Sequence, residues 1–296
     1  MSEEQKVMPN GQSTSEDVQD VSGSRLASQL VIFPLAIVLV GVGVYLMLGM
    51  LTVEEKTAQD YLNTIRTGGI NSRWQAAFDM VKALAKEQKE GQVSPRFAQE
   101  LIRVYEASEH DDPRVRRFLI RAMMMVPDPA IVPVLIEALD GPDEDTRIYA
   151  ILSLGAQKDN RAIDPLIRMA KWDDAGIRKT AVYALGQFRD DRATGLLEWA
   201  LQDPAPDVRW NAAVQLAHQG NGKGSEVLGE MLNRSFLESV DGMNESHREK
   251  AMIQAIRAVG LLKVEMLVST LETLRNSDSN MKVRQAAIEV LKAWKK

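Results

Sequence analysis

Four arginines recur along the chain at a fixed step of 31 residues, and their spacing could support anion chemistry. They are Arg116, Arg147, Arg178 and Arg209. A row of guanidinium groups could bind a polyanion, because each group forms paired hydrogen bonds with a phosphate or a carboxylate. A structural ladder explains the pattern better, since the same residue recurs in every unit as a scaffolding residue would. In that ladder each arginine bonds carbonyl or acid groups of the adjacent repeat turn.

An aspartate stands four residues ahead of each of the first three arginines. These are Asp112, Asp143 and Asp174, and the fourth unit offers Asp207 two residues ahead instead. A carboxylate at a helix start accepts hydrogen bonds from free backbone N–H groups and is attracted by the positive end of the helix dipole. The pattern therefore predicts a helix that begins beside each arginine.

Residues of the kinds that perform catalysis are not arranged for it in this sequence. The three histidines, His110, His218 and His247, lack partners at metal-ligand spacing, and no His-Glu dipeptide occurs. The chain contains no cysteine and no Walker A, G-x-S-x-G or G-x-G-x-x-G motif. We therefore expect no enzymatic activity, no metal and no cofactor.

The 31-residue step divides the middle of the chain into four regular units, 111–141, 142–172, 173–203 and 204–234. Each unit holds two stretches of helical periodicity joined by a short turn. In one of them Ile177, Ala181 and Leu185 fall along a single stripe. A fixed period in this range is typical of a solenoid, in which each unit buries its apolar face against its neighbours.

The units follow the pattern D-x-x-V-R-x-x-A-x-x-A-L-G and then A-x-x-P-L-I, most plainly in 178–186 and 162–170. This pattern resembles HEAT-like repeats, specifically the short kind found in phycobilin lyases. The resemblance covers 71–296 and implies an all-α fold, an α-solenoid of about six HEAT-like helical hairpins. It also implies an alternative function, a bilin-lyase-like or other protein-modifying enzyme component, although a shared scaffold does not carry an activity with it.

The segments before the repeats differ sharply in composition. Residues 1–25 are polar and acidic and predict a disordered tail. Residues 26–53 carry no charge, and the apolar stretch 30–51 is long enough for a single transmembrane helix in contact with the lipid bilayer. Residues 54–70 predict a linker helix ahead of the repeat domain, 71–296. We therefore expect a single-pass membrane protein, with the side of the soluble domain left open.

Charge and repeat geometry favour protein partners. The net charge of −5 argues against nucleic acid, which requires a basic footprint. The resemblance to HEAT-like solenoids implies that the second helix of each unit lines the inner curve. One column along these helices, in steps of 31, comprises Glu137, Arg168, Trp199 and Glu230. A polar row with a central aromatic is typical of an interface, and a solvated face with Trp199 partly packed is the alternative.

A 12-residue excess interrupts the array within 235–249 and places Phe236 and Leu237 ahead of a loop. Insertions of this kind often carry binding function. We therefore expect a membrane-anchored interaction scaffold or an accessory subunit of a membrane complex, which binds other proteins through the solenoid surface. A purely structural subunit of a larger complex is a further alternative.

Overall fold

The computed structural model describes residues 33–52 and 55–294, with side chains omitted at 48–52. The chain separates into two units, residues 1–55 and 56–296. In the first, α2 (Phe33–Thr52) is an apolar helix whose described side chains, 33–47, are exposed. The predicted disordered tail, 1–25, lies outside the described residues.

The prediction of a single-pass membrane protein is wrong. Among the described residues, no helix combines the length and the apolar character that crossing a bilayer requires. The expected contact of residues 30–51 with the lipid bilayer depended on that prediction and is not supported either.

The second unit contains six helical hairpins within its described residues, and the predicted all-α repeat solenoid is confirmed. The hairpins are α4 (Ile70–Glu90) with α5 (Phe97–Glu106), α6 (Pro113–Met123) with α7 (Ile131–Ala138), α8 (Glu144–Gln157) with α9 (Ile163–Met169), α10 (Ala175–Leu185) with α11 (Asp191–Ala200), α12 (Pro206–His218) with α13 (Ser225–Leu232), and α15 (Glu245–Leu262) with α16 (Val268–Ser277). The helix α3 (Ala58–Thr67) precedes them, α14 (Arg234–Glu238) lies between α13 and α15, and α17 (Met281–Trp294) follows. Single 3-10 turns, η2 (Asn160–Ala162), η3 (Gly222–Gly224) and η4 (Glu265–Leu267), lead into α9, α13 and α16.

Local sequence signals explain where these helices begin. The side chains of Asp112, Asp143 and Asp174 accept hydrogen bonds from backbone N–H groups in the first turns of α6, α8 and α10. Pro113 and Pro206 stand in the first turns of α6 and α12, where the missing N–H removes no helical hydrogen bond. The apolar stripes then join one core that runs from Ala58 to Leu291. Capping therefore sets the helix starts, and lengthwise burial stabilises the stack.

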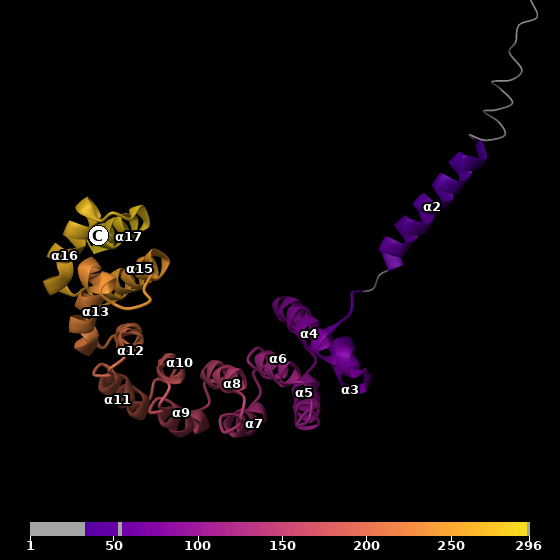
Figure 1. Cartoon of the computed structure of the whole chain (residues 1–296), viewed down its shortest axis with the longest axis horizontal. Helices are drawn as coiled ribbons and strands as arrows, with labels where there is room; N and C mark the ends of the chain where they lie inside the picture. The colour runs from indigo at the N-terminus through magenta and orange to yellow at the C-terminus, as the bar shows by residue number, and fades with distance from the viewer. Residues whose placement is uncertain (1–32, 53–54, 295–296) are drawn as a thin grey trace, which may run out of the picture. The chain divides into compact units, whose positions relative to one another are not determined.

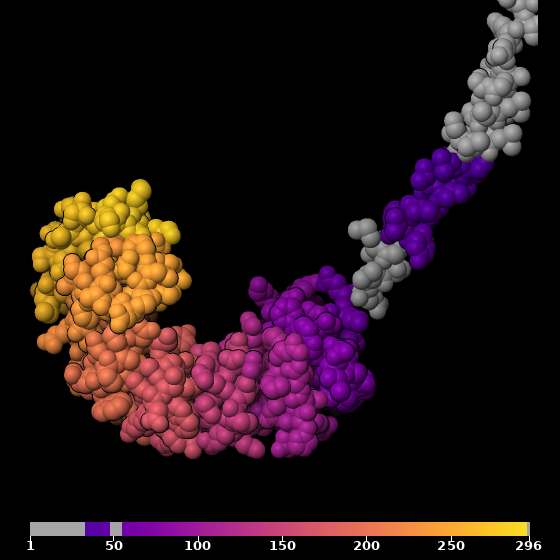
Figure 2. Space-filling model, viewed as in Figure 1, coloured from indigo at the N-terminus to yellow at the C-terminus, as the bar shows by residue number. Residues whose placement is uncertain are grey.

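Taken by itself, the second unit follows an arc, and Figure 1 shows which helices line its inner side. The helices α6, α8, α10 and α12 lie inside the curve, and α7, α9, α11 and α13 lie outside it. The space-filling view shows the same continuous curved body (Figure 2). The assumption that second helices line the inner curve is therefore wrong, and the predicted column lies on the outer side.

Small residues explain this curvature. Inner helices pack directly against one another along the series, whereas consecutive outer helices lie further apart. A β-carbon added at Gly155 of α8 would lie 2.9 Å from the Ala184 β-carbon of α10, closer than two such atoms pack. Glycine and alanine thus allow close approach on the inner side. The outer helices are left splayed, with grooves between them.

Candidate functional site

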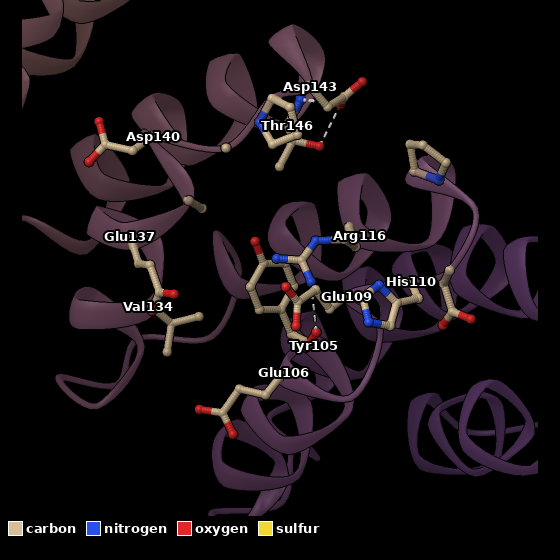
Figure 3. A pocket seen from close by; sticks show the side chains of 15 residues that line it. Tyr105, Glu106, Glu109, His110, Arg116, Val134, Glu137, Asp140, Asp143 and Thr146 are labelled. Atoms are coloured by element: carbon tan, nitrogen blue, oxygen red, sulfur yellow. Dashed lines mark hydrogen bonds between the residues drawn. The ribbon is translucent and has the colours of Figure 1, made fainter.

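A cavity of about 670 Å³ opens in the groove between the outer helices α5 and α7. Its walls come from the end of α5, from α7, and from the turns that lead into α6 and α8 (Figure 3). Six carboxylates and one arginine line it, together with Tyr105, His110 and Thr146. The lining therefore carries a formal charge of −5 with histidine neutral.

The cavity exists because one repeat position is a glycine. In the next two units the corresponding residue, 25 positions after the ladder arginine, covers that arginine. The Arg147 guanidinium lies 5.1 Å from the Trp172 ring centroid, and Arg178 Nε donates to Asp203 Oδ2 at 2.8 Å. Gly141 occupies this position after Arg116, so no side chain covers Arg116 from there. The space that a side chain fills in the neighbouring units is empty here.

The six carboxylates of the lining fall into two groups. Three are neutralised: Asp111 by Arg73 at 2.6 Å, Asp140 by Arg168 at 3.1 Å and Asp143 by Arg117 at 2.6 Å. Glu106, Glu109 and Glu137 make no hydrogen bond or ion pair with any described residue. The cavity therefore presents three carboxylates that have no ion-pair partner among the described residues.

Tyr105 forms the floor between these carboxylates. The residue is 4% exposed, yet its hydroxyl has no hydrogen-bond partner among the described residues. The Arg116 guanidinium lies 4.0 Å from the ring centroid, and Arg116 Nη1 donates to the Tyr105 carbonyl at 3.2 Å. In Figure 3 the hydroxyl points into the space between Arg116 and Glu137. Burial raises the pKa of Tyr105, against the opposing effect of Arg116, so the hydroxyl stays protonated at neutral pH.

The four repeated arginines bond the backbone at the turn before their own helix. Arg147 donates to the carbonyls of Leu139 and Gly141 at 2.9 and 2.7 Å. Arg178 and Arg209 likewise donate to carbonyls of the turns that precede α10 and α12, and Arg116 to the end of α5. These bonds satisfy carbonyls that the end of an outer helix leaves without intrahelical partners. Arg178 is also paired with a buried acid, because the Asp203 side chain is 1% exposed.

Carboxylate pKa values reflect the same pairing. Hydrogen bonds from Arg117, and then from Thr146, hold the pKa of Asp143 far below its ordinary value. Burial by itself would raise the pKa of Asp203, but Arg178 and the Ala205 N–H together outweigh it and lower that pKa. Both carboxylates are therefore ionised at neutral pH as structural ion-pair partners.

The column proposed from the sequence forms a line along the outer helices. Glu137, Arg168 and Trp199 are exposed, Trp199 to 53%, and Glu230 is half-buried. Among the described residues, neighbouring members of the column form no hydrogen bond, ion pair or cation–π contact with one another but are linked through other residues. Arg168 pairs with Asp140 of the preceding unit, Lys171 Nζ lies 5.9 Å from the Trp199 ring centroid, and Glu230 accepts from Arg209 at 3.4 Å. Only Glu137 borders the cavity.

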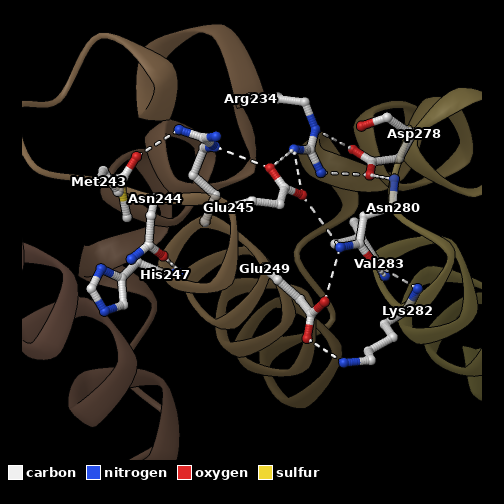
Figure 4. A network of polar contacts seen from close by, with 12 residues as sticks. Arg234, Met243, Asn244, Glu245, His247, Glu249, Asp278, Asn280, Lys282 and Val283 are labelled. Atoms are coloured by element: carbon white, nitrogen blue, oxygen red, sulfur yellow. Dashed lines mark hydrogen bonds and ion pairs between the residues drawn. The ribbon is translucent and has the colours of Figure 1, made fainter.

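The insert is folded into the solenoid between its last two hairpins. Leu237 is fully buried and Phe236 half-buried against the core, both in α14, so Leu237 presents no surface to a partner. Figure 4 shows the polar network that holds this region, with Arg234 between Glu245 and Asp278. The Arg234–Asp278 pair is 2.7 Å long, and the Asp278 side chain is 2% exposed. The insert thus connects the last two hairpins.

Two features of this surface were not predicted from the sequence. One is a second series of residues in steps of 31, which caps the turns inside the hairpins: Asp128, Asp159, Asp190 and Asn221. Each side-chain oxygen accepts a hydrogen bond from the backbone N–H two residues later, at 2.8–3.0 Å. The cavity residues Tyr105, Glu106 and Glu109 were also missed. A signal for the cavity was present, because aligning the units sets Gly141 against Trp172 and Asp203.

Comparisons with known proteins agree with this architecture. The family model for HEAT repeats matches residues 101–182 and 170–240, so these segments are HEAT-like repeats. The structure is similar to the phycocyanin lyase complex of CpcE and CpcF from Nostoc sp. PCC7120, with 19% identity over 83% of this chain and 90% of that one and a TM-score of 0.53. It is also similar to YibA of Escherichia coli, with 17% identity over 79% and 82% of the two chains and a TM-score of 0.50. None of the curated proteins matches the sequence.

Proposed function

We propose that this protein is a binding scaffold whose outer helices dock a partner protein. The observation that carries the proposal is the run of exposed groups from the α5–α7 cavity to Trp199. It begins with the unpaired Glu137, continues through Arg168 and ends at an aromatic ring that is 53% exposed. Exposed tryptophan beside charged groups is the composition from which interface hot spots are built.

The rigidity of the scaffold supports this proposal. Ladder arginines bond the ends of α5 and α7 and the turns that follow α9 and α11, so the exposed side chains of these helices are held at a repeat spacing before any partner arrives. Such preorganisation lowers the entropy that binding would otherwise cost. A partner protein, such as another subunit of a larger complex, would therefore meet a surface that is already ordered.

We further propose that this surface acts by binding and carries out no reaction. Among the residues lining the cavity, the hydroxyl of Thr146 donates to Asp143 Oδ2 at 2.5 Å, which superficially resembles a nucleophile beside a base. The pKa of Asp143 is held far below its ordinary value by Arg117, so this carboxylate is a poor base at neutral pH. The contact therefore supports a helix cap instead of a catalytic pair.

Site-specific photocrosslinking in cells tests the proposal. A photoreactive residue replaces Trp199 on the outer side, and in a matched variant it replaces Tyr183 of the inner helix α10, which is 46% exposed. We expect a discrete crosslinked species, identified by mass spectrometry, from position 199 and none from position 183. Equal yields at the two positions, or no crosslink at 199, would refute docking on the outer helices.

A further inference from the structure

The cavity between α5 and α7 is lined by polar groups that have no partner among the described residues. Glu106, Glu109 and Glu137 have no partners among the described residues, although the other three carboxylates of the lining are each paired with an arginine. The Tyr105 hydroxyl, in a residue that is 96% buried, is also without a partner and points into the same space. Buried polar groups are normally satisfied, so this one indicates a missing ligand atom.

Resting on the scaffold function above, we propose that this cavity receives a lysine or arginine side chain from a basic segment of the partner protein. The carboxylates accept the N–H groups of the incoming cation, and the Tyr105 hydroxyl oxygen accepts another. Arg116 is held over the tyrosine ring and bonds the Tyr105 carbonyl. Because three carboxylates of the lining are already paired with other arginines, the single charge of Arg116 offsets only one of the three unpaired carboxylates, which leaves a net charge of −2.

Other occupants fit the charges less well. In the two following units the equivalent space is filled by Trp172 and by Asp203, which shows that an aromatic or an acid can cover a ladder arginine. An acidic side chain entering here would face three unpaired carboxylates. An aromatic ring would cover those carboxylates without neutralising them, at a desolvation cost. A cation both fills the space and compensates the charge.

The absent side chain at Gly141 provides a way to close the cavity without touching its charges. Gly141 does not have a positive φ, and a β-carbon added there would lie 3.3 Å from the Ala138 carbonyl oxygen, which small adjustments accommodate. Gly141→Trp would place on Arg116 the ring that Trp172 places on Arg147. Gly195→Trp is the matched control, because the β-carbon at Gly195 on α11 meets nothing within 4 Å.

The test measures peptide binding to the full chain by fluorescence anisotropy at low and at physiological salt. The probe is a labelled nine-residue peptide in which lysine and arginine alternate with glycine and serine. Two comparison peptides replace every basic residue with glutamate or with glutamine. We expect the basic peptide to bind, its affinity to fall with added salt, and neither comparison peptide to bind.

Variants then place the binding in the cavity. Gly141→Trp and, separately, the triple replacement Glu106→Gln, Glu109→Gln and Glu137→Gln should each weaken binding of the basic peptide at least tenfold, as expected when a charge-assisted hydrogen bond is lost. Tyr105→Phe should weaken it about threefold to tenfold. Gly195→Trp should leave it unchanged. A control variant that replaces the exposed Glu226, Glu238 and Glu272 with glutamine should change the affinity for the basic peptide less than twofold.

The outcomes separate this proposal from the scaffold function. No binding of the basic peptide, stronger binding of the glutamate peptide, or equal losses from the cavity triple and the control triple would overturn the cation site. If Gly141→Trp disturbs the fold, as circular dichroism would show, the glutamine and phenylalanine variants decide the matter. A specific crosslink at position 199 together with absent peptide binding would retain the scaffold and remove the cation site.

Discussion

Replacing Arg178 with alanine would leave an ionised carboxylate buried without its partner. Arg178 donates to both oxygens of Asp203, at 2.8 and 2.9 Å, and the Asp203 side chain is 1% exposed. Removing one member of a buried ion pair costs about 3–5 kcal/mol. For a folded unit of this size, 1 kcal/mol shifts the melting temperature by about 2–4 °C, so a decrease of about 6–20 °C is expected. Circular dichroism at 222 nm during heating at pH 7 measures it.

The neighbouring residue supplies the control for this prediction. Lys179 pairs with Asp207 at 3.2 Å, and both side chains are largely exposed, so Lys179→Ala should cost no more than about 1 kcal/mol. The double variant Arg178→Ala/Asp203→Asn should melt at a higher temperature than Arg178→Ala alone, because it removes the unpaired charge. A shift for Arg178→Ala no larger than that for Lys179→Ala would refute the reasoning.

The pH dependence of the same pair has a definite sign. The pKa of Asp203 is lowered in the folded protein, so the ion pair contributes its full stability above the unfolded pKa of about 3.9 and loses it as the pH falls through the folded value. In Arg178→Ala the main group that lowers this pKa is gone. The difference in melting temperature between the natural protein and the variant should therefore narrow below about pH 4.

Three further replacements test other parts of the structure. Gly155→Val should separate α8 from α10 and cost at least about 1–3 kcal/mol in urea unfolding, whereas Gly195→Val should not, because nothing lies within 4 Å of its β-carbon. Arg234→Ala leaves Asp278 unpaired, and we expect a loss of about 3 kcal/mol with faster amide hydrogen exchange in α15 and α17; unchanged exchange there would contradict it. Trp199→Ala should shift the melting temperature by less than about 2 °C, since the ring is 53% exposed, but lower partner affinity at least tenfold in a titration with the crosslinked partner.

The fold was predictable from the sequence because every regular unit repeats the same physical solution. The Asp112, Asp143 and Asp174 caps and the buried stripe through Ile177, Ala181 and Leu185 all follow from spacing alone. Curvature was not predictable in the same way. It depends on which layer of helices packs more closely, and that depends on pairs such as Gly155 with Ala184, which only become visible when neighbouring units are stacked. The prediction consequently placed the second helices on the inner side of the curve, whereas they lie on the outer side.

The candidate site illustrates a different limit. Glu137 was selected because it belongs to a periodic column, and it does border the cavity, but Tyr105 and Glu109 lie in a less regular part of the array and have no periodic signal. Leu237 was chosen because it interrupts the period, and it proves to be buried. An interruption can equally add core, as α14 does, or add surface. Burial decides between these outcomes, and it cannot be determined from spacing.

Departures from the repeat are where this protein can differ from a plain scaffold. A position that is identical in every unit is required by stacking, so a replacement there would affect stability first. A position that changes from unit to unit is free of that requirement. Gly141, Trp172 and Asp203 occupy one such position, and from that position the ladder arginine is consequently left uncovered, stacked or paired in successive units. The cavity beside Arg116 is lined by unpaired carboxylates, so the least regular part of the ladder is the part best suited to recognise a partner.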